Sequence, residues 1–165
     1  MPEIFIRDAV PEDVPAILRM IRELAEFERQ PDAVVATEAD LLRDGWGPQK
    51  RFACRIGEFE GAVAGFALWF PNYSTWEGRA GIYLEDLYVS PAVRGHGVGE
   101  QMIVDLAQIA IREGFRRLDL SVLDWNPARN FYLRLGLEYR SDWLSYRISG
   151  EALAVLAAKG VASGA

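Results

Sequence analysis

A glycine-rich segment in the second half of the chain, Arg94-Gly95-His96-Gly97-Val98-Gly99, most constrains the fold. It follows the apolar, strand-like run from Tyr83 to Val89 and precedes a segment with helical spacing. A helix that begins here presents N–H groups without intrahelical acceptors, and its aligned peptide dipoles add about half a positive charge. Gly95 and Gly97 permit positive φ and a close approach of the backbone to an anion. The segment therefore predicts a phosphate site between a strand and a helix.

Two common nucleotide-binding motifs fit this segment poorly. The dinucleotide motif places its glycines after a first strand, with an acidic residue ~20 residues further on. Here the glycines lie past mid-chain, and the acids Glu85 and Asp86 precede them. The nucleoside triphosphatase motif requires Lys and then Ser or Thr after the glycines, and no Lys follows Gly99. Both nucleotide-binding interpretations are therefore poorly supported.

The segment instead resembles the signature of the GNAT superfamily of acyl-CoA-dependent N-acetyltransferases, which is Arg or Gln, two residues, Gly, one residue, then Gly or Ala. A second motif, from Asn126 to Gly136, resembles the family's Asn…Phe-Tyr-x-x-x-Gly helix, although its Asn-to-Tyr spacing is one residue shorter. Over nearly the whole chain, the sequence is similar to the diamine and thialysine N-acetyltransferases. The segments that carry this similarity are 21–28, 37–45, 83–86 and 125–126.

The resemblance implies an α/β fold with a mixed, mostly antiparallel central sheet, flanking helices and two strands that splay apart at the acyl-CoA site. It implies acetyl-CoA as co-substrate and no metal; His96, the sole histidine, would offer only its backbone amide. The implied coenzyme-binding residues are Leu87, Tyr88, Val89, Arg94, Gly95, His96, Gly97, Val98, Gly99, Glu100 and Asn126.

Acetyl transfer to an amine requires a proton acceptor, because an alkylammonium has a pKa near 10 and must lose a proton before it attacks a thioester. Glu85 is the predicted acceptor, since strand alternation would place it on the face opposite Leu84 and Asp86. The matching Glu of the diamine enzymes contacts the substrate amine. Asp86 is predicted to be structural.

The resemblance implies that Tyr132 protonates the departing thiolate, while a strand amide near Leu87 would stabilise the oxyanion. Phe27 stands where the subgroup has Tyr, and Asp119 where it has His. The predicted substrate-binding residues are Phe27, Glu28, Trp76, Glu85, Asp119 and Asp142.

Length and composition set bounds that do not depend on any family. The chain has 165 residues, half of them apolar, which predicts one domain over 1–165 with a disordered tail at 160–165. It has no apolar run of the ~20 residues that span a bilayer, and no signal-peptide pattern at its start. Cys54, the only cysteine, excludes an intrachain disulfide and favours the cytoplasm. The net charge of -6 argues against nucleic-acid binding and suits a small cationic substrate. A homodimer is expected by analogy.

Hydrophobic periodicity and turn signals predict alternating strands and helices. Thr37 and Asp40 form the pattern of a capping box in front of a short helix. The predicted strands are 4–7, 52–58, 63–70, 80–89, 118–123 and 143–148, and the predicted helices are 11–28, 37–45, 98–113, 127–135 and 151–158.

The sequence indicates an N-acetyltransferase that moves an acetyl group from acetyl-CoA to a diamine, a polyamine or a thialysine-like amino acid by direct attack. Two alternatives stay open. One is an enzyme of the same fold that acts on a protein N-terminus or an antibiotic amine. The other is a catalytically silent acyl-CoA-binding module, which would keep the glycine loop but tolerate loss of Tyr132 and Glu85.

Overall fold

The computed structural model describes residues 1–161 and 164, so the predicted disordered tail at 160–165 lies partly outside the described residues. The chain divides into two compact units, Met1–Arg129 and Asn130–Ala165, and its organisation as a single domain stays a prediction. No helix among the described residues is long and apolar enough to cross a membrane.

The first unit contains most of the secondary structure. Its elements are β1 (Ile4–Asp8), the 3-10 helix η1 (Pro11–Asp13), α1 (Val14–Phe27), α2 (Glu38–Trp46), β2 (Ala53–Phe59), β3 (Ala62–Ser74), β4 (Arg79–Val89), η2 (Pro91–Val93), α3 (Val98–Arg112) and β5 (Leu118–Leu120). Helix α4 (Ala128–Arg134) begins at the end of this unit and continues into the second, which also contains α5 (Gly150–Ala157).

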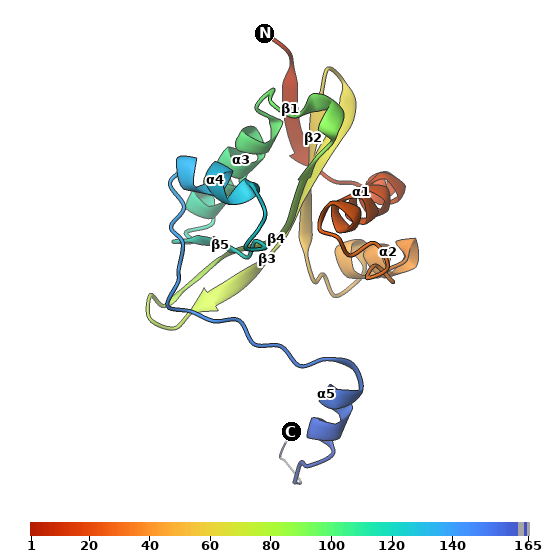
Figure 1. Cartoon of the computed structure of the whole chain (residues 1–165), viewed down its shortest axis with the longest axis vertical. Coiled ribbons are helices and arrows are strands. Elements are labelled where there is room, and N and C mark those ends of the chain that lie inside the picture. The colour runs from red at the N-terminus through yellow and green to blue at the C-terminus, as the bar shows by residue number, and fades with distance from the viewer. Residues whose placement is uncertain (162–163, 165) are drawn as a thin grey trace. The chain divides into compact units, whose positions relative to one another are not determined.

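The five strands form one sheet in the order β1-β2-β3-β4-β5. Neighbouring strands are antiparallel from β1 to β4, and only β4 and β5 run parallel. Helices α1 and α2 cover one face of this sheet and α3 covers the other (Figure 1). This confirms the predicted mixed, mostly antiparallel sheet with flanking helices.

Both helical faces follow the predicted apolar spacing. On α1, the buried Val14, Ile17 and Leu18 pack in the core that also contains Phe66 and Tyr88 of the sheet. On α3, the buried side chains recur every three or four residues, which is the period of one helix face. They are Val98, Met102, Ile103, Leu106, Ile109 and Ala110.

Strand β4 carries a bulge at Glu85. Leu68 of β3 pairs with Asp86, but the next residue, Trp69, pairs with Leu84, so Glu85 is an extra residue with no opposite partner. Paired residues project from the same face and consecutive residues alternate, so Leu84 and Asp86 lie on opposite faces of the sheet. The prediction that both lie on the face opposite Glu85 is therefore wrong, because simple alternation does not hold across a bulge.

The parallel pairing of β4 with β5 stops directly before this bulge. The ladder ends at Leu84 and Leu120, while β4 continues to Val89. The predicted strand 118–123 is thus too long; Ser121 instead shares a side-chain hydrogen bond of 2.9 Å with Tyr83. The first unit therefore presents an open β4 edge next to the glycine-rich loop, as the predicted splay of two strands requires.

Other boundaries also differ from the predictions. Strand β3 extends to Ser74, beyond the predicted end at residue 70, because its ladder with β4 continues to Arg79. The capping box of Thr37 and Asp40 forms as predicted, but α2 continues through Gly45 and ends at Trp46. The predicted strand 143–148 is wrong. A strand requires a backbone ladder, and the ladders of the described sheet end at β5.

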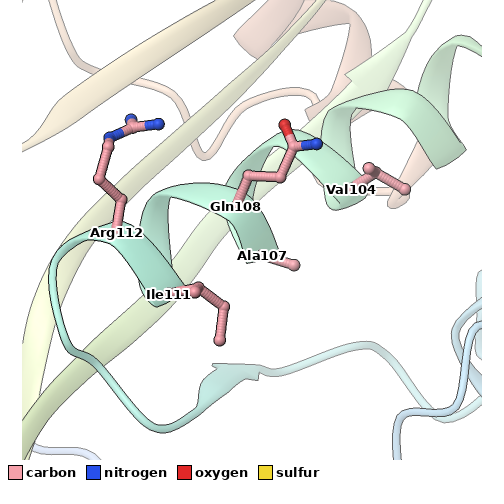
Figure 2. A pocket seen from close by; sticks show the side chains of 5 residues that line it. All are labelled: Val104, Ala107, Gln108, Ile111 and Arg112. Atoms are coloured by element: carbon pink, nitrogen blue, oxygen red, sulfur yellow. The ribbon is translucent and has the colours of Figure 1, made fainter.

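The outer face of α3 carries a shallow hollow of about 420 Å³, and its lining side chains all come from that helix (Figure 2). None of the predicted site residues lines it. The lining residues are Val104, Ala107, Gln108, Ile111 and Arg112.

A paired carboxylate fixes the entry into α1. The guanidinium of Arg7 donates to both carboxylate oxygens of the buried Asp13, at 2.7 and 2.9 Å, and to Glu58 at 2.7 Å. The backbone N–H of Val10 also donates to Asp13, at 2.8 Å. These bonds, led by the one from Arg7, lower the pKa of Asp13.

We expect Asp13→Ala to lower the free energy of unfolding by about 3 kcal/mol, because it leaves a partly buried guanidinium without its main partner. Since the folded pKa is lowered, the contribution of Asp13 is present above pH ~4 and is lost as the pH falls through the folded pKa. Urea unfolding of the wild type and the variant should therefore converge in acid. A constant difference from neutral pH into acid would contradict this role, and Asp32→Ala, at an exposed aspartate, serves as control.

Candidate active site

The glycine-rich loop has the geometry of an anion site. Gly95 and Gly97 have φ of 85° and 89°, a region that L side chains rarely adopt. Gly97 is the N-cap of α3 and no side chain caps it; the first helical bond runs from Gln101 N–H to the Gly97 carbonyl. The amides of Val98, Gly99 and Glu100 therefore have no acceptor within the helix. This cradle fits a phosphate of the expected coenzyme.

The two long side chains of this loop pack against neighbouring elements. The ring of His96 lies 4.9 Å from the ring of Phe59, in agreement with a role for its backbone rather than its imidazole. Nε of Arg94 donates to the carbonyl of Val89 at 3.0 Å, and its guanidinium carbon lies 5.3 Å from the centre of the Phe27 ring. Arg94 thus connects the loop to the open strand edge and to the end of α1.

The open edge offers two of the three predicted strand amides. Ser90 N–H donates to the Ala64 carbonyl of β3 at 2.7 Å, so alternation directs the amides of Leu87 and Val89 away from β3. The amide of Tyr88 points toward β3 instead. The Tyr88 hydroxyl donates to Glu23 at 2.6 Å, and burial together with this bond raises its pKa to about 12.

Three carboxylates gather at the bulge. Glu28 caps the C-terminal end of α1, Glu85 is the exposed extra residue of β4, and Asp86 follows it. Burial, and then the charges of Glu85 and Glu28, raise the pKa of Asp86 to about 6. Burial, and then the charge of Glu85, also raise the pKa of Glu28. This acidic cluster, Glu28–Glu85–Asp86, is suited to an ammonium group, which would relieve the repulsion among the three.

Aromatic and cationic side chains flank the cluster at the end of α1. The rings of Phe27 and Trp125 lie 5.9 Å apart, and the guanidinium carbon of Arg29 lies 3.9 Å from the centre of the Trp125 ring. Sequence reasoning assigned no role to Arg29, and it treated Asp86 as structural. A second acid directly after Glu85 in an apolar strand was a usable signal, because two adjacent acids are unusual in such a strand.

The other predicted substrate residues have different surroundings. Asp119 accepts from Asn72 at 3.1 Å and pairs with Arg117 at 3.2 Å, so its charge is already compensated within the chain. Trp76 lies in the turn before β4 and is 87% exposed. The side chain of Asn126, predicted to contact the coenzyme, accepts from the Ala128 N–H at 2.9 Å and so caps α4.

Tyr132 and Asp142 belong to the second unit. Tyr132 lies on α4, is half-buried, and its ring is tilted against that of Phe131 at 5.2 Å. Asp142 is exposed in a turn that is closed by the Trp143 N–H donating to the Arg140 carbonyl. The first unit thus brings together Glu28, Glu85 and the glycine loop.

Comparison with known proteins identifies the family of the chain. The model of the acetyltransferase (GNAT) family matches residues 17–137. A thialysine N-epsilon-acetyltransferase of Bos taurus is 40% identical, over 96% of this chain and all of its own length. A spermidine/spermine N(1)-acetyltransferase-like protein of Homo sapiens is 39% identical, over 90% of this chain and 23% of its own length.

Solved structures show the same fold. An integron cassette protein from V. cholerae superposes with a TM-score of 0.78 and 26% identity, over 93% of this chain and 97% of its own. An aminoglycoside acetyltransferase from an uncultured soil sample superposes with a TM-score of 0.72 over 88% of this chain and 97% of its own, but at 17% identity. The chain therefore belongs to the GNAT acetyltransferase family. It is an N-acetyltransferase, of the family that transfers acetyl groups to amines and uses acetyl-CoA as co-substrate.

The raised pKa of Asp86 should make the free energy of unfolding depend on pH. The native protein retains a proton at Asp86 between pH ~4 and ~6 that the unfolded chain has lost, so the cost of this buried charge appears as the pH rises through that window. Asp86→Asn should therefore stabilise the protein more at pH 7.5 than at pH 4. We expect the change that it causes in the free energy of unfolding to be about 2 kcal/mol more favourable at pH 7.5 than at pH 4. Urea unfolding at the two pH values measures this. An equal effect at both would contradict a destabilising buried carboxylate.

Proposed function

We propose that this enzyme acetylates the primary amine of a small cationic substrate, either an amino acid with a terminal amine or a diamine. The observation that carries the proposal is the acidic cluster, Glu28–Glu85–Asp86, at the bulge that opens the β4 edge. The relatives named for thialysine and for spermidine and spermine support the same substrate chemistry.

The cluster would bind the substrate as an ammonium and then remove its proton. The exposed Glu85 is the proton acceptor, because the bulge carries it out of the regular ladder beside the open edge. The amide of Leu87, which points to that edge, is a donor for the oxygen of the attacked thioester carbonyl. The loop from Arg94 to Glu100 would bind the pyrophosphate, and Tyr132 would protonate the departing thiolate.

The single cysteine supports direct attack over a route through an acyl-enzyme. Burial raises the pKa of Cys54 to about 12, so the thiol stays protonated and is not a nucleophile at neutral pH. A single cysteine, which can form no intrachain disulfide, also suits the proposed cytoplasmic location. By analogy with the family, the proposed working form is a homodimer.

We expect Glu85→Gln to lower kcat/KM for the amine by about 100-fold or more at pH 7.5, the range for loss of a general base. The deficit should shrink toward pH 10, where the amine loses its proton without help. Thiol release from acetyl-CoA, followed over pH with putrescine, spermidine and thialysine, measures both effects. Tyr132→Phe should also lower kcat, whereas the exposed Glu113→Gln is the control with the same change of charge. Turnover that does not depend on Glu85 at any pH would contradict the mechanism.

Gly97→Ala should raise KM for acetyl-CoA by about 10-fold or more and leave KM for the amine unchanged. A Cβ at this position strains the αL backbone that aims the α3 amides at the phosphates. Gly78→Ala is a matched control, because Gly78 also has a positive φ, of 63°, but lies in the turn before β4. Equal effects of the two variants on KM for acetyl-CoA would show that the effect reflects general strain rather than the loop.

A further inference from the structure

Arg29 occupies an unusual position beside the acidic cluster. It follows Glu28 at the end of α1 and has a φ of 64°, in the left-handed region where helix ends usually carry Gly. A long cationic side chain here costs backbone strain, and such strain persists where the surrounding structure holds it and is often linked to function. The position therefore suggests a use for this particular side chain.

The contacts of Arg29 leave its hydrogen-bonding edge available. Its guanidinium carbon lies 3.9 Å above the Trp125 ring, and Trp125 is in turn tilted against Phe27. Stacking uses the flat face of the guanidinium and leaves the N–H groups at its rim. Among the described residues, no ion pair involves Arg29. The side chain is also exposed, so a ligand can reach it.

The neighbouring arginine is occupied differently. Arg94 also lies over the Phe27 ring, but its Nε already donates to the Val89 carbonyl, and it belongs to the loop proposed for the pyrophosphate. Arg29 directly follows Glu28 in the chain, so a positive and a negative side chain stand in consecutive positions. A substrate with an ammonium at one end and a carboxylate at the other matches this order of charges.

We propose that Arg29 binds the α-carboxylate of an amino acid substrate and so selects amino acids with a terminal amine over diamines of the same length. The planar fork of its N–H donors matches the α-carboxylate, which stands beside the α-ammonium of an amino acid. A diamine would present its second ammonium to this like charge with no carboxylate beside it. This inference rests on the proposed function and deepens it by naming the substrate class.

The test compares thialysine with its decarboxylated diamine, which has the same chain but lacks the carboxylate. With the full-length enzyme, Arg29→Gln should lower kcat/KM for thialysine by about 10- to 100-fold, mainly through KM, as expected for loss of a charge-assisted hydrogen bond. For the diamine it should leave kcat/KM unchanged or raise it. Arg29→Lys should restore part of the preference. Arg116→Gln, an exposed arginine in the loop before β5, is the control with the same change of charge.

Arg29→Gly separates a purely structural role from selection, because Gly relieves the left-handed strain. We expect a melting temperature no lower than that of the wild type, together with the same loss of preference as in Arg29→Gln. A wild-type enzyme that uses both substrates equally, or a ratio that does not change in any Arg29 variant, would overturn the inference while leaving acetyl transfer intact. No turnover with any amine would overturn the proposed function, and this inference with it.

Discussion

The β-bulge at Glu85 is the constraint on which the first unit's site depends. One extra residue in β4 ends the parallel ladder with β5 at Leu84 and separates Leu84 and Asp86 onto opposite faces. The same extra residue leaves the β4 edge open from there to Val89, where the glycine loop follows. In a regular strand, Leu84 and Asp86 would lie on the same face, and Glu85 would have an opposite partner in the ladder with β3.

The electrostatics follow from that geometry. Three carboxylates close together repel one another, and for Glu28 and Asp86 burial adds the larger part of the cost, which is why the pKa of each rises. Such an arrangement is typical of a functional site, where a bound cation offsets the repulsion among the carboxylates. On the other side, α3 begins without a side-chain cap, so positive potential faces the expected pyrophosphate. The loop and the bulge thus present opposite charges to the two proposed substrates.

Local patterns in the sequence were sufficient for much of this architecture. The capping box of Thr37 and Asp40 and the positive φ of Gly97 depend on residues a few positions apart, and both were predictable. The bulge was not, because it depends on the register between two strands, which no single strand encodes. The compensation of Asp119 by Arg117 and Asn72 also depends on contacts that form only in the sheet. Residues 143–148 alternate like a strand, yet alternation alone supplies no ladder partner.

The most direct test of the central claim is a ¹³C NMR titration of the aspartate carboxyls, with the Asp86 signal assigned by its loss in Asp86→Asn. We expect an apparent pKa of about 6 for Asp86 in the free enzyme, and a lower value when thialysine or a diamine is bound, because an ammonium within the cluster favours the charged form. An Asp86 pKa that does not change with saturating amine would show that the ammonium binds elsewhere, and would contradict the account.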